Sequence, residues 1–173
     1  MAHVDFKILP LTKDLAEKYC DSILMSLDLI PVVSKHTREQ LLSDTKNDRI
    51  LHGKWLHSIL MLTNDKKYIG VAIGYERKSE GNDKYPKNCI YLNDFAISAS
   101  FQKKGLGKIL LNNFLEHNKN IGLKLIGGEI AFAIQTNSAD WNNHVQRLYE
   151  NAGFKKISEK KYENRVDNVY LLS

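Results

Sequence analysis

Residues Gln102-Lys103-Lys104-Gly105-Leu106-Gly107 form a glycine-containing turn on which the interpretation of the whole chain depends. The turn follows a strand-like run that ends near Ile97 and precedes a helix-like run that begins at Lys108. Because glycine lacks a Cβ atom, several backbone N–H groups can converge on one point, and the following helix adds its partially positive N-terminus. This order of strand, turn and helix predicts an anion site, and phosphate is the anion that suits it best.

Two common phosphate-binding motifs do not match this turn. A P-loop needs a Ser or Thr directly after its lysine, but Ile109 follows Lys108. The dinucleotide fingerprint G-x-G-x-x-G needs a third glycine at the position of Leu110. The sequence therefore argues against a P-loop nucleotidase and against a nicotinamide-dependent enzyme.

The turn resembles the signature of the GNAT superfamily of N-acetyltransferases, [Gln/Arg]-x-x-Gly-x-[Gly/Ala], which follows a central strand and holds the pyrophosphate of acetyl-CoA. Gln102, Gly105 and Gly107 match its defined positions. A second block, residues 142–154, resembles the family segment Asn-x-x-[small]-x-x-[Leu/Phe]-Tyr-x-x-x-Gly-Phe, although Val145 replaces the usual small residue. The resemblance covers residues 88–157 well and the first half of the chain only by the order of its elements.

This resemblance implies an α/β fold with a mixed sheet. The GNAT-like architecture is a mostly antiparallel central sheet of six to seven strands, flanked by about four helices and splayed at the acetyl-CoA site. The chain has 173 residues, of which 43% are hydrophobic and 26% charged. These are ordinary globular values, so we expect one domain over residues 1–173.

Hydrophobic periodicity and capping signals predict the individual elements. Strands are expected over residues 4–9, 56–63, 68–77, 89–98, 124–134, 155–161 and 168–172, and helices over 12–25, 37–47, 108–120 and 142–152. Thr12 is the predicted N-cap of the first helix, and Thr37 with Gln40 predicts a capping box for the second. Residues 64–67 are expected to form the turn of a hairpin.

The family resemblance also implies which residues bind acetyl-CoA. The backbone of Phe95, Ala96 and Ile97 would bind the pantetheine arm as an added strand. The pyrophosphate would be held by Gln102, Lys103, Lys104, Gly105, Leu106, Gly107 and Lys108. Gln102 has an alternative interpretation as an exposed turn residue. Asn142 matches a cofactor-contacting asparagine, and it is also a candidate helix N-cap; both roles are compatible.

Tyr149 matches the family tyrosine that lies near the cofactor sulfur and can protonate the departing thiolate, a task that suits a phenol. Its alternative role is packing, because Val145, Leu148 and Ala152 share its helical face. A general base is less well defined. Asp94 on the central strand could take the amine proton if burial raises its pKa, and Glu129 on the following strand is the rival. Either carboxylate could instead be ion-paired or solvent-facing, and no base is needed if the amine arrives neutral.

Several other functions have no support in the sequence. Cys20 and Cys89 are not in metal-like spacing, and the six histidines form no H-x-x-x-H pair, so we expect no metal. The net charge is +5, but the lysines are scattered, which argues against nucleic acid. No apolar run approaches the ~20 residues that span a bilayer, and the N-terminus lacks a secretory pattern, so a cytoplasmic protein is expected.

The leading hypothesis is an N-acetyltransferase that moves an acetyl group from acetyl-CoA to a primary amine in a ternary complex. The competing hypothesis is a non-catalytic acyl-CoA-binding or RNA-binding module on the same scaffold. The sequence does not identify the amine acceptor, whose contacts are expected from residues 26–36, 79–88 and 136–141. A homodimer is suggested by family analogy alone.

Overall fold

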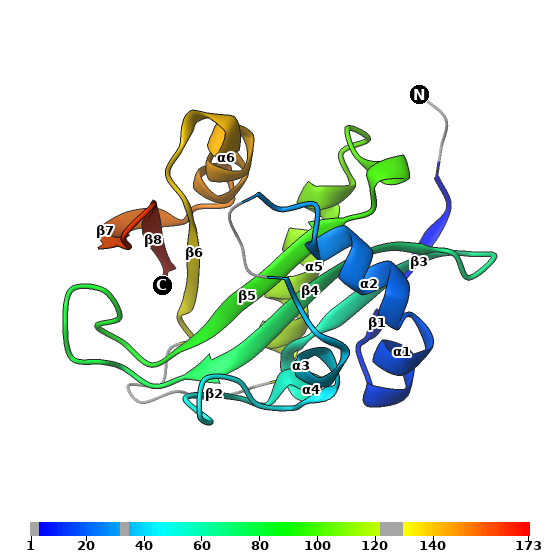
Figure 1. Cartoon of the computed structure of the whole chain (residues 1–173), viewed down its shortest axis with the longest axis horizontal. Coiled ribbons are helices and arrows are strands. Elements are labelled where there is room, and N and C mark those ends of the chain that lie inside the picture. Colours follow the sequence, from blue (N-terminus) through cyan, green and yellow to red (C-terminus); the bar gives the residue numbers. More distant parts are fainter. Residues whose placement is uncertain (1–3, 32–34, 122–129) are drawn as a thin grey trace.

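The computed structural model describes residues 4–31, 35–121 and 130–173, which fold around a mixed sheet (Figure 1). The strands are β1 (Phe6–Pro10), β2 (Leu51–His52), β3 (Ile59–Thr63), β4 (Tyr68–Arg77), β5 (Cys89–Ile97), β6 (Phe132–Asn137), β7 (Lys155–Lys161) and β8 (Val166–Leu172). Seven of them follow the order β1-β3-β4-β5-β6-β8-β7, and the two-residue β2 pairs with the end of β4. Only β5 and β6 pair in parallel; the other neighbours are antiparallel.

Helices cover both faces of this sheet. They are α1 (Lys13–Lys18), α2 (Cys20–Leu27), α3 (Arg38–Leu42), α4 (Lys54–His57), α5 (Leu106–Asn120) and α6 (Asn143–Asn151), with short 3₁₀ turns at Ala99–Phe101 and Asp140–Asn142. Figure 1 shows α2 in front of the sheet and α5 behind it. The predicted α/β fold with a mostly antiparallel sheet is confirmed, and the described residues add β2 and two short helices to the expected set.

The apolar core forms two clusters, one on each face of the sheet. The front cluster joins α1, α2 and α3 to the sheet, with Ile23, Leu27 and Leu41 among its buried side chains. The rear cluster joins α5 and α6 to the sheet, with Leu110 and Phe114 fully enclosed. β3 and the first eight residues of β4 are buried on both sides, because each face is covered by helices.

The helix-capping predictions are confirmed. The Thr12 side chain accepts a hydrogen bond from the Leu15 amide at 3.2 Å, and Thr37 with Gln40 forms the complete capping box of α3. The predicted first helix is divided at Tyr19, whose backbone leaves the helical region.

The predicted second helix is too long, because α3 ends at Leu42 rather than near residue 47. The chain then turns back through three consecutive residues with positive φ, Asn47, Asp48 and Arg49. Helix α4 was not predicted, and β3 consequently begins at Ile59 rather than at residue 56. The predicted strand over 124–134 is β6, which begins at Phe132; residues 124–129 lie outside the described residues.

One extra residue in β5 changes the face to which its side chains point. Ile73 of β4 is opposite Asp94 and the next residue, Gly74, is opposite Leu92, so Asn93 is the extra residue of a β-bulge. Tyr91 and Ala96 therefore belong to the front cluster, whereas Leu92 and Phe95 belong to the rear one. Simple alternation would have placed Asp94 on the same face as Leu92, but the bulge moves it to the front.

β5 and β6 diverge beyond a short paired region. Their parallel pairing extends only from Ile90 with Phe132 to Leu92 with Ile134. Past this point β5 continues to Ile97 and β6 continues to Asn137, but the two strands no longer pair with each other. Figure 1 shows them separating. The predicted splay of the sheet is therefore present between these two strands.

A buried histidine connects α4, β4 and α5. The His57 side chain is completely buried; its Nδ1 lies 2.6 Å from Asn118 Oδ1 and its Nε2 lies 3.0 Å from Glu76 Oε1. The Asn118 amide nitrogen donates to the carbonyls of His57 and Phe114, which orients its oxygen toward the ring. His57 Nδ1 is therefore the donor to Asn118.

Of the helices in the described parts of the chain, none combines the length and the apolar character that crossing a bilayer requires.

Replacing Asn118 with Ala should lower the free energy of unfolding by about 1–3 kcal/mol, because the His57 N–H and carbonyl would lose a buried partner. Urea unfolding followed by circular dichroism measures this change. Asn113→Ala is the matched control, since Asn113 lies on the exposed face of the same helix and bonds only Ile109 of its own helix. Equal losses in the two variants would contradict the importance of the His57 network.

Candidate active site

The gap between β5 and β6 exposes backbone groups of β5. The Ser98 amide donates to Ile69 of β4 at 2.8 Å, so alternation directs the Ala96 backbone toward β4 as well. The N–H and C=O groups of Phe95 and Ile97 consequently point into the gap. The Ile97 carbonyl accepts a hydrogen bond from Gln102 Nε2 at 3.0 Å, which leaves the remaining groups as an open strand edge. An extended ligand could pair with this edge as an additional strand.

The glycine turn beyond this edge has the backbone geometry of an anion site. Lys103 has φ 59° and Gly105 has φ 77°, and Gly105 is the N-cap residue of α5 without any capping side chain. The first N–H groups of α5 therefore have no partner within the helix, and they face the turn. Lys103, Lys104 and Lys108 are exposed, whereas Leu106 is buried and anchors the turn. Three exposed lysines thus lie within three residues of a helix terminus that could bind an anion.

Gly107 lies where β5, α5 and α6 converge. A Cβ atom added at this position would lie 3.9 Å from side-chain atoms of Leu148 and Phe95 and 4.0 Å from Ile97. These are ordinary van der Waals distances, so alanine fits there, but a longer side chain would extend into the space between the glycine turn and the open edge of β5.

Tyr149 of α6 is placed at the same convergence, on the rear face of the sheet. Its side chain is buried, and its ring centroid lies 6.4 Å from Phe95, 6.1 Å from Phe154 and 6.4 Å from Tyr170. Burial raises the pKa of Tyr149 well above the ordinary phenol value, so the hydroxyl carries its proton at neutral pH. Among the described residues no group hydrogen-bonds this hydroxyl. Tyr149 therefore packs in the rear cluster beside Phe95, and its role as a proton donor stays a prediction.

Asn142 is buried and fastens the start of α6 to the end of β6. Its side-chain nitrogen donates to Thr136 Oγ1 and to the Asn137 carbonyl, each at 2.7 Å. Asn142 occupies the N-cap position of α6, but its side chain makes no capping hydrogen bond. Asn142 therefore fixes the end of β6, which borders the gap on the side opposite β5. Its contact with a cofactor stays a prediction.

Asp94 lies on the opposite, front face. Its carboxylate is 11% exposed and accepts hydrogen bonds from His36 Nε2 at 2.9 Å and from Asn93 Nδ2 at 2.7 Å. Burial would raise the pKa of Asp94, but these two hydrogen bonds and the nearby positive charge of Lys46 hold it below its ordinary value. The condition under which we expected Asp94 to act as a base, a raised pKa, is therefore not met. The rival Glu129 lies outside the described residues.

A cavity of about 20 Å³ adjoins Asp94. Its lining includes His36, Lys54, Tyr75 and Asp94. The Lys54 side chain is buried, and its ammonium donates to the carbonyls of Gln40 and Leu41 at 2.8 and 2.7 Å. Burial lowers the pKa of Lys54 to about 8. Neither His36 nor Lys54 belongs to a sequence motif. Sequence analysis therefore singled out neither residue, although His36 ends the segment 26–36 from which acceptor contacts are expected.

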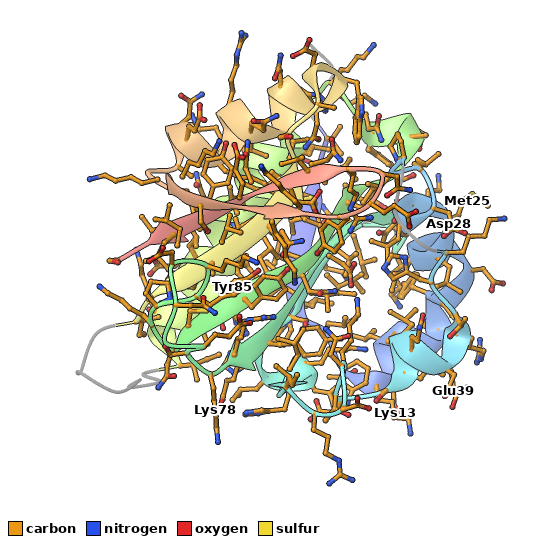
Figure 2. All side chains as sticks on the ribbon, turned by 60° about the vertical axis from the view of Figure 1, so that its left-hand side comes forward. Lys13, Met25, Asp28, Glu39, Lys78 and Tyr85 are labelled. Carbon is orange, nitrogen blue, oxygen red and sulfur yellow. The ribbon has the colours of Figure 1, made fainter. Side chains whose placement is uncertain are left out.

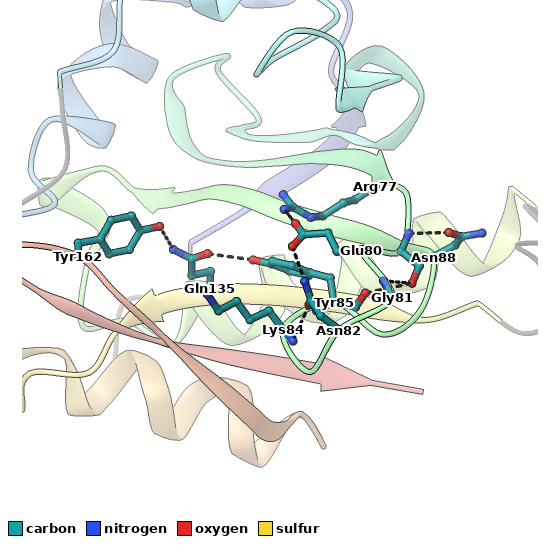
Figure 3. Close-up of polar contacts among 10 residues, drawn as sticks. Arg77, Glu80, Gly81, Asn82, Lys84, Tyr85, Asn88, Gln135 and Tyr162 are labelled. Carbon is teal, nitrogen blue, oxygen red and sulfur yellow. Dashed lines mark hydrogen bonds and ion pairs between the residues drawn. The ribbon is translucent and has the colours of Figure 1, made fainter.

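The loop between β4 and β5 is fastened to the C-terminal strands on this front side (Figure 3). The Tyr85 hydroxyl donates to Gln135 Oε1 at 2.9 Å, and Gln135 Nε2 donates to the Tyr162 hydroxyl at 2.7 Å. Gln135 Nε2 also donates to Asp167 Oδ2 at 2.7 Å. The Arg77 guanidinium stacks on the Tyr85 ring at 3.8 Å. Figure 2 shows Tyr85 inside the molecule, in contrast to Met25 on the outer surface of α2. Residues around the predicted acceptor segment 79–88 are thus fixed by polar contacts.

Trp141 is 43% exposed and borders a groove between the β6–α6 connection and the β7–β8 turn. The groove is lined by Asn137, Ser138, Ala139, Trp141, Asn164, Arg165 and Val166. In residues 4–31, 35–121 and 130–173, no three His, Cys, Asp or Glu side chains gather as a metal site would require.

Comparison with known proteins identifies the class to which this arrangement belongs. The model of the acetyltransferase (GNAT) family matches residues 30–154, which is well over half of the chain. The protein is therefore a member of the GNAT acetyltransferase family. A search among curated proteins found no match.

Solved structures share the fold over nearly their whole length. The NatC complex bound to Gag peptide and CoA superposes with a TM-score of 0.71 at 14% identity, covering 97% of this chain and 98% of that one. The ribosomal-protein-S18-alanine N-acetyltransferase from Escherichia coli gives 0.67 at 13% identity, with 96% and 92% covered. A GNAT family acetyltransferase from Elizabethkingia anophelis with acetyl-CoA bound gives 0.63 at 18% identity, with 98% of each chain covered. At these identities the likeness concerns the fold.

The two glycines of the turn should respond oppositely to alanine. Gly105→Ala should destabilise the protein by about 1 kcal/mol, because an L-residue is strained at φ 77°. Gly107→Ala should be neutral or stabilise it by up to about 1 kcal/mol, because Gly107 is helical and alanine fits there. Urea unfolding of the free protein measures both changes. Losses of similar size in both variants would contradict the different backbone roles of these glycines.

Proposed function

We propose that the protein is an acetyl-CoA-dependent N-acetyltransferase that transfers the acetyl group directly to a primary amine. The observation that carries this proposal is the open edge of β5, which leads from the glycine turn to Phe95, whose ring centroid lies 6.4 Å from that of Tyr149. A CoA pyrophosphate fits the N–H groups and ammonium groups at Gly105, and the amides of a pantetheine arm fit the backbone of Phe95 and Ile97. CoA or acetyl-CoA in two of the similar structures supports this assignment.

In this proposal the proton donor and the incoming amine lie on opposite faces of the sheet. The amine nitrogen forms a bond to the acetyl carbonyl carbon, the carbon–sulfur bond breaks, and the nitrogen loses one proton. Tyr149 on the rear face is protonated at neutral pH, so its phenol can give a proton to the departing thiolate. The amine approaches from the front face, where Asp94 and the loop held by Tyr85 lie. Neither cysteine takes part, since Cys20 and Cys89 are both buried.

A peptide α-amine is the first acceptor to test. Of the similar structures, the NatC complex is bound to Gag peptide and CoA, and another is the ribosomal-protein-S18-alanine N-acetyltransferase. An acceptor panel should therefore contain a tetrapeptide with a free N-terminus, the same peptide with an acetylated N-terminus and an internal lysine, spermidine and an aminoglycoside. Release of the CoA thiol, detected with a chromogenic disulfide, reports transfer to any of them.

The decisive experiment is calorimetric titration with acetyl-CoA. The protein should bind one equivalent, and Gly105→Glu should abolish binding, because the new carboxylate would occupy the anion site. Gly81→Glu is the matched control: Gly81 also has a positive φ, 66°, and no atom lies within 4 Å of an added Cβ. The control should bind normally.

Failure of the wild-type protein to bind acetyl-CoA would refute the proposed function. Normal binding in Gly105→Glu would refute the proposed pyrophosphate site. Salt-dependent binding of RNA without thiol release would favour the competing RNA-binding hypothesis.

Tyr149→Phe should lower kcat by roughly 10- to 1,000-fold if Tyr149 protonates the thiolate. Its acetyl-CoA affinity should not change, because phenylalanine keeps the ring contacts with Phe95, Phe154 and Tyr170. Tyr170→Phe is a suitable control, since the Tyr170 hydroxyl is engaged with Glu150 on the surface of α6. Unchanged turnover in Tyr149→Phe would leave Tyr149 with a packing role alone.

A further inference from the structure

His36 and Asp94 form a pair on the front face of the sheet that the family motifs do not include. His36 immediately precedes the capping box of α3, whereas Asp94 immediately follows the bulge residue of β5. The ring and the carboxylate are 12% and 11% exposed, and His36 Nε2 lies 2.9 Å from Asp94 Oδ1. Asn93 donates to the other carboxylate oxygen at 2.7 Å, so the carboxylate is held from two sides.

These contacts determine where the His36 proton is. An ionised carboxylate only accepts hydrogen bonds, and the pKa of Asp94 is held below its ordinary value. Nε2 of His36 must therefore be the donor. In the neutral ring the other nitrogen, Nδ1, then carries the lone pair. Nδ1 is buried, and no group of the described residues forms a hydrogen bond with it. Nδ1 of His36 is thus free to accept a proton, while Nε2 of the same ring is held by the Asp94 carboxylate.

The position of the pair relative to the gap suits an incoming amine. Asp94 is the residue next to Phe95, whose backbone faces the gap and whose ring contacts Tyr149 on the rear face. The proton acceptor and the proton donor therefore flank the same point of β5 from opposite sides. Direct transfer needs this separation, because the amine loses its proton on the side from which it attacks and the thiolate leaves on the other.

Charged and polar side chains surround the pair on the side of the cavity. Lys46, Lys54 and Tyr75 line the adjoining cavity with His36 and Asp94, and Asp44 lies in the same chain segment as Lys46. Two lysines and the Asp94 carboxylate, whose oxygen lies 2.9 Å from Nε2, thus lie beside the ring. The cavity of about 20 Å³, which His36 helps to line, is large enough for one water molecule.

Resting on the proposed acetyltransferase function, we propose that His36 is the general base of the reaction and that Asp94 is its positioning residue. As the amine nitrogen bonds to the acetyl carbon, its proton passes through one water molecule to His36 Nδ1, and Asp94 balances the imidazolium that forms. The proton leaves the ring to solvent after the product departs. This assignment replaces the expectation that Asp94 itself takes the proton.

The test compares the pH dependence of kcat in the wild type, His36→Gln and Asp94→Asn, with the best acceptor of the amine panel at saturation. Histidine is the side chain that ordinarily changes charge between pH 5 and 8, so the wild type should lose activity on the acid side of this range. His36→Gln should lower kcat about 100-fold and abolish this acid limb. Asp94→Asn should keep the limb but move it to lower pH, because the imidazolium loses its stabilising charge.

Two controls separate this role from a structural one. Acetyl-CoA affinity and unfolding midpoint should be close to wild type in His36→Gln, and His52→Gln, which alters an exposed histidine near β2, should retain the wild-type profile. Nitrogen-15 NMR of the imidazole rings at pH 8 should show one histidine with a protonated Nε2 and a bare Nδ1 whose signals disappear in His36→Gln.

The outcomes are distinguishable. An acid limb that persists unchanged in His36→Gln belongs to the acceptor amine and overturns the role of His36, while leaving the acetyltransferase function intact. A protonated Nδ1 on His36 overturns the proposed tautomer and the proton path. Absence of thiol release with every amine, in a wild-type protein that binds acetyl-CoA, overturns the catalytic function and the role of His36 together.

Discussion

The candidate site depends on one extra residue in the central strand. Asn93 interrupts the pairing of β4 with β5, so every side chain after it points to the face opposite the one that simple alternation gives. Phe95 and Ile97 are thereby directed toward α5 and α6, and Asp94 is directed toward α1–α3. Without the bulge, the aromatic ring that contacts Tyr149 and the carboxylate that binds His36 would exchange faces. The bulge thus determines both halves of the site.

The gap beside β5 also needs a structure that keeps β6 from closing it. Unpaired backbone groups in a sheet are costly unless something else binds them, so two strands that begin in register would ordinarily continue to pair. Here the end of β6 is bound elsewhere: its residues 132–137 pair with β8, and Thr136 and Asn137 accept hydrogen bonds from Asn142. The Gln135 side chain forms hydrogen bonds with Tyr85, Tyr162 and Asp167. β6 therefore follows the C-terminal strands rather than β5.

Local chemistry explains which features the sequence predicted well. Helix caps at Thr12 and Thr37, the turn at residues 64–67 and the glycine turn at Gly105 are encoded within a few residues, and each formed as expected. The face of Asp94 was not predictable, because Asn93 differs from any other strand residue only through its pairing with β4. The His36–Asp94 pair joins residues 58 positions apart, and α4 owes its start to Gly53 at φ 75° rather than to a capping side chain. These features arise from tertiary contacts and carry no short sequence signal.

Buried Lys54 has a chemical consequence if, as proposed, the protein binds a reactive thioester. A pKa of about 8 means that a substantial fraction of this amine is uncharged near neutral pH, and uncharged amines react spontaneously with thioesters. Lys54 would be more nucleophilic than an ordinary lysine if it were accessible. Its side chain is only 1% exposed and donates to two carbonyls at the end of α3. The fold therefore shields this amine from self-acylation, and accidental modification should fall on exposed lysines instead.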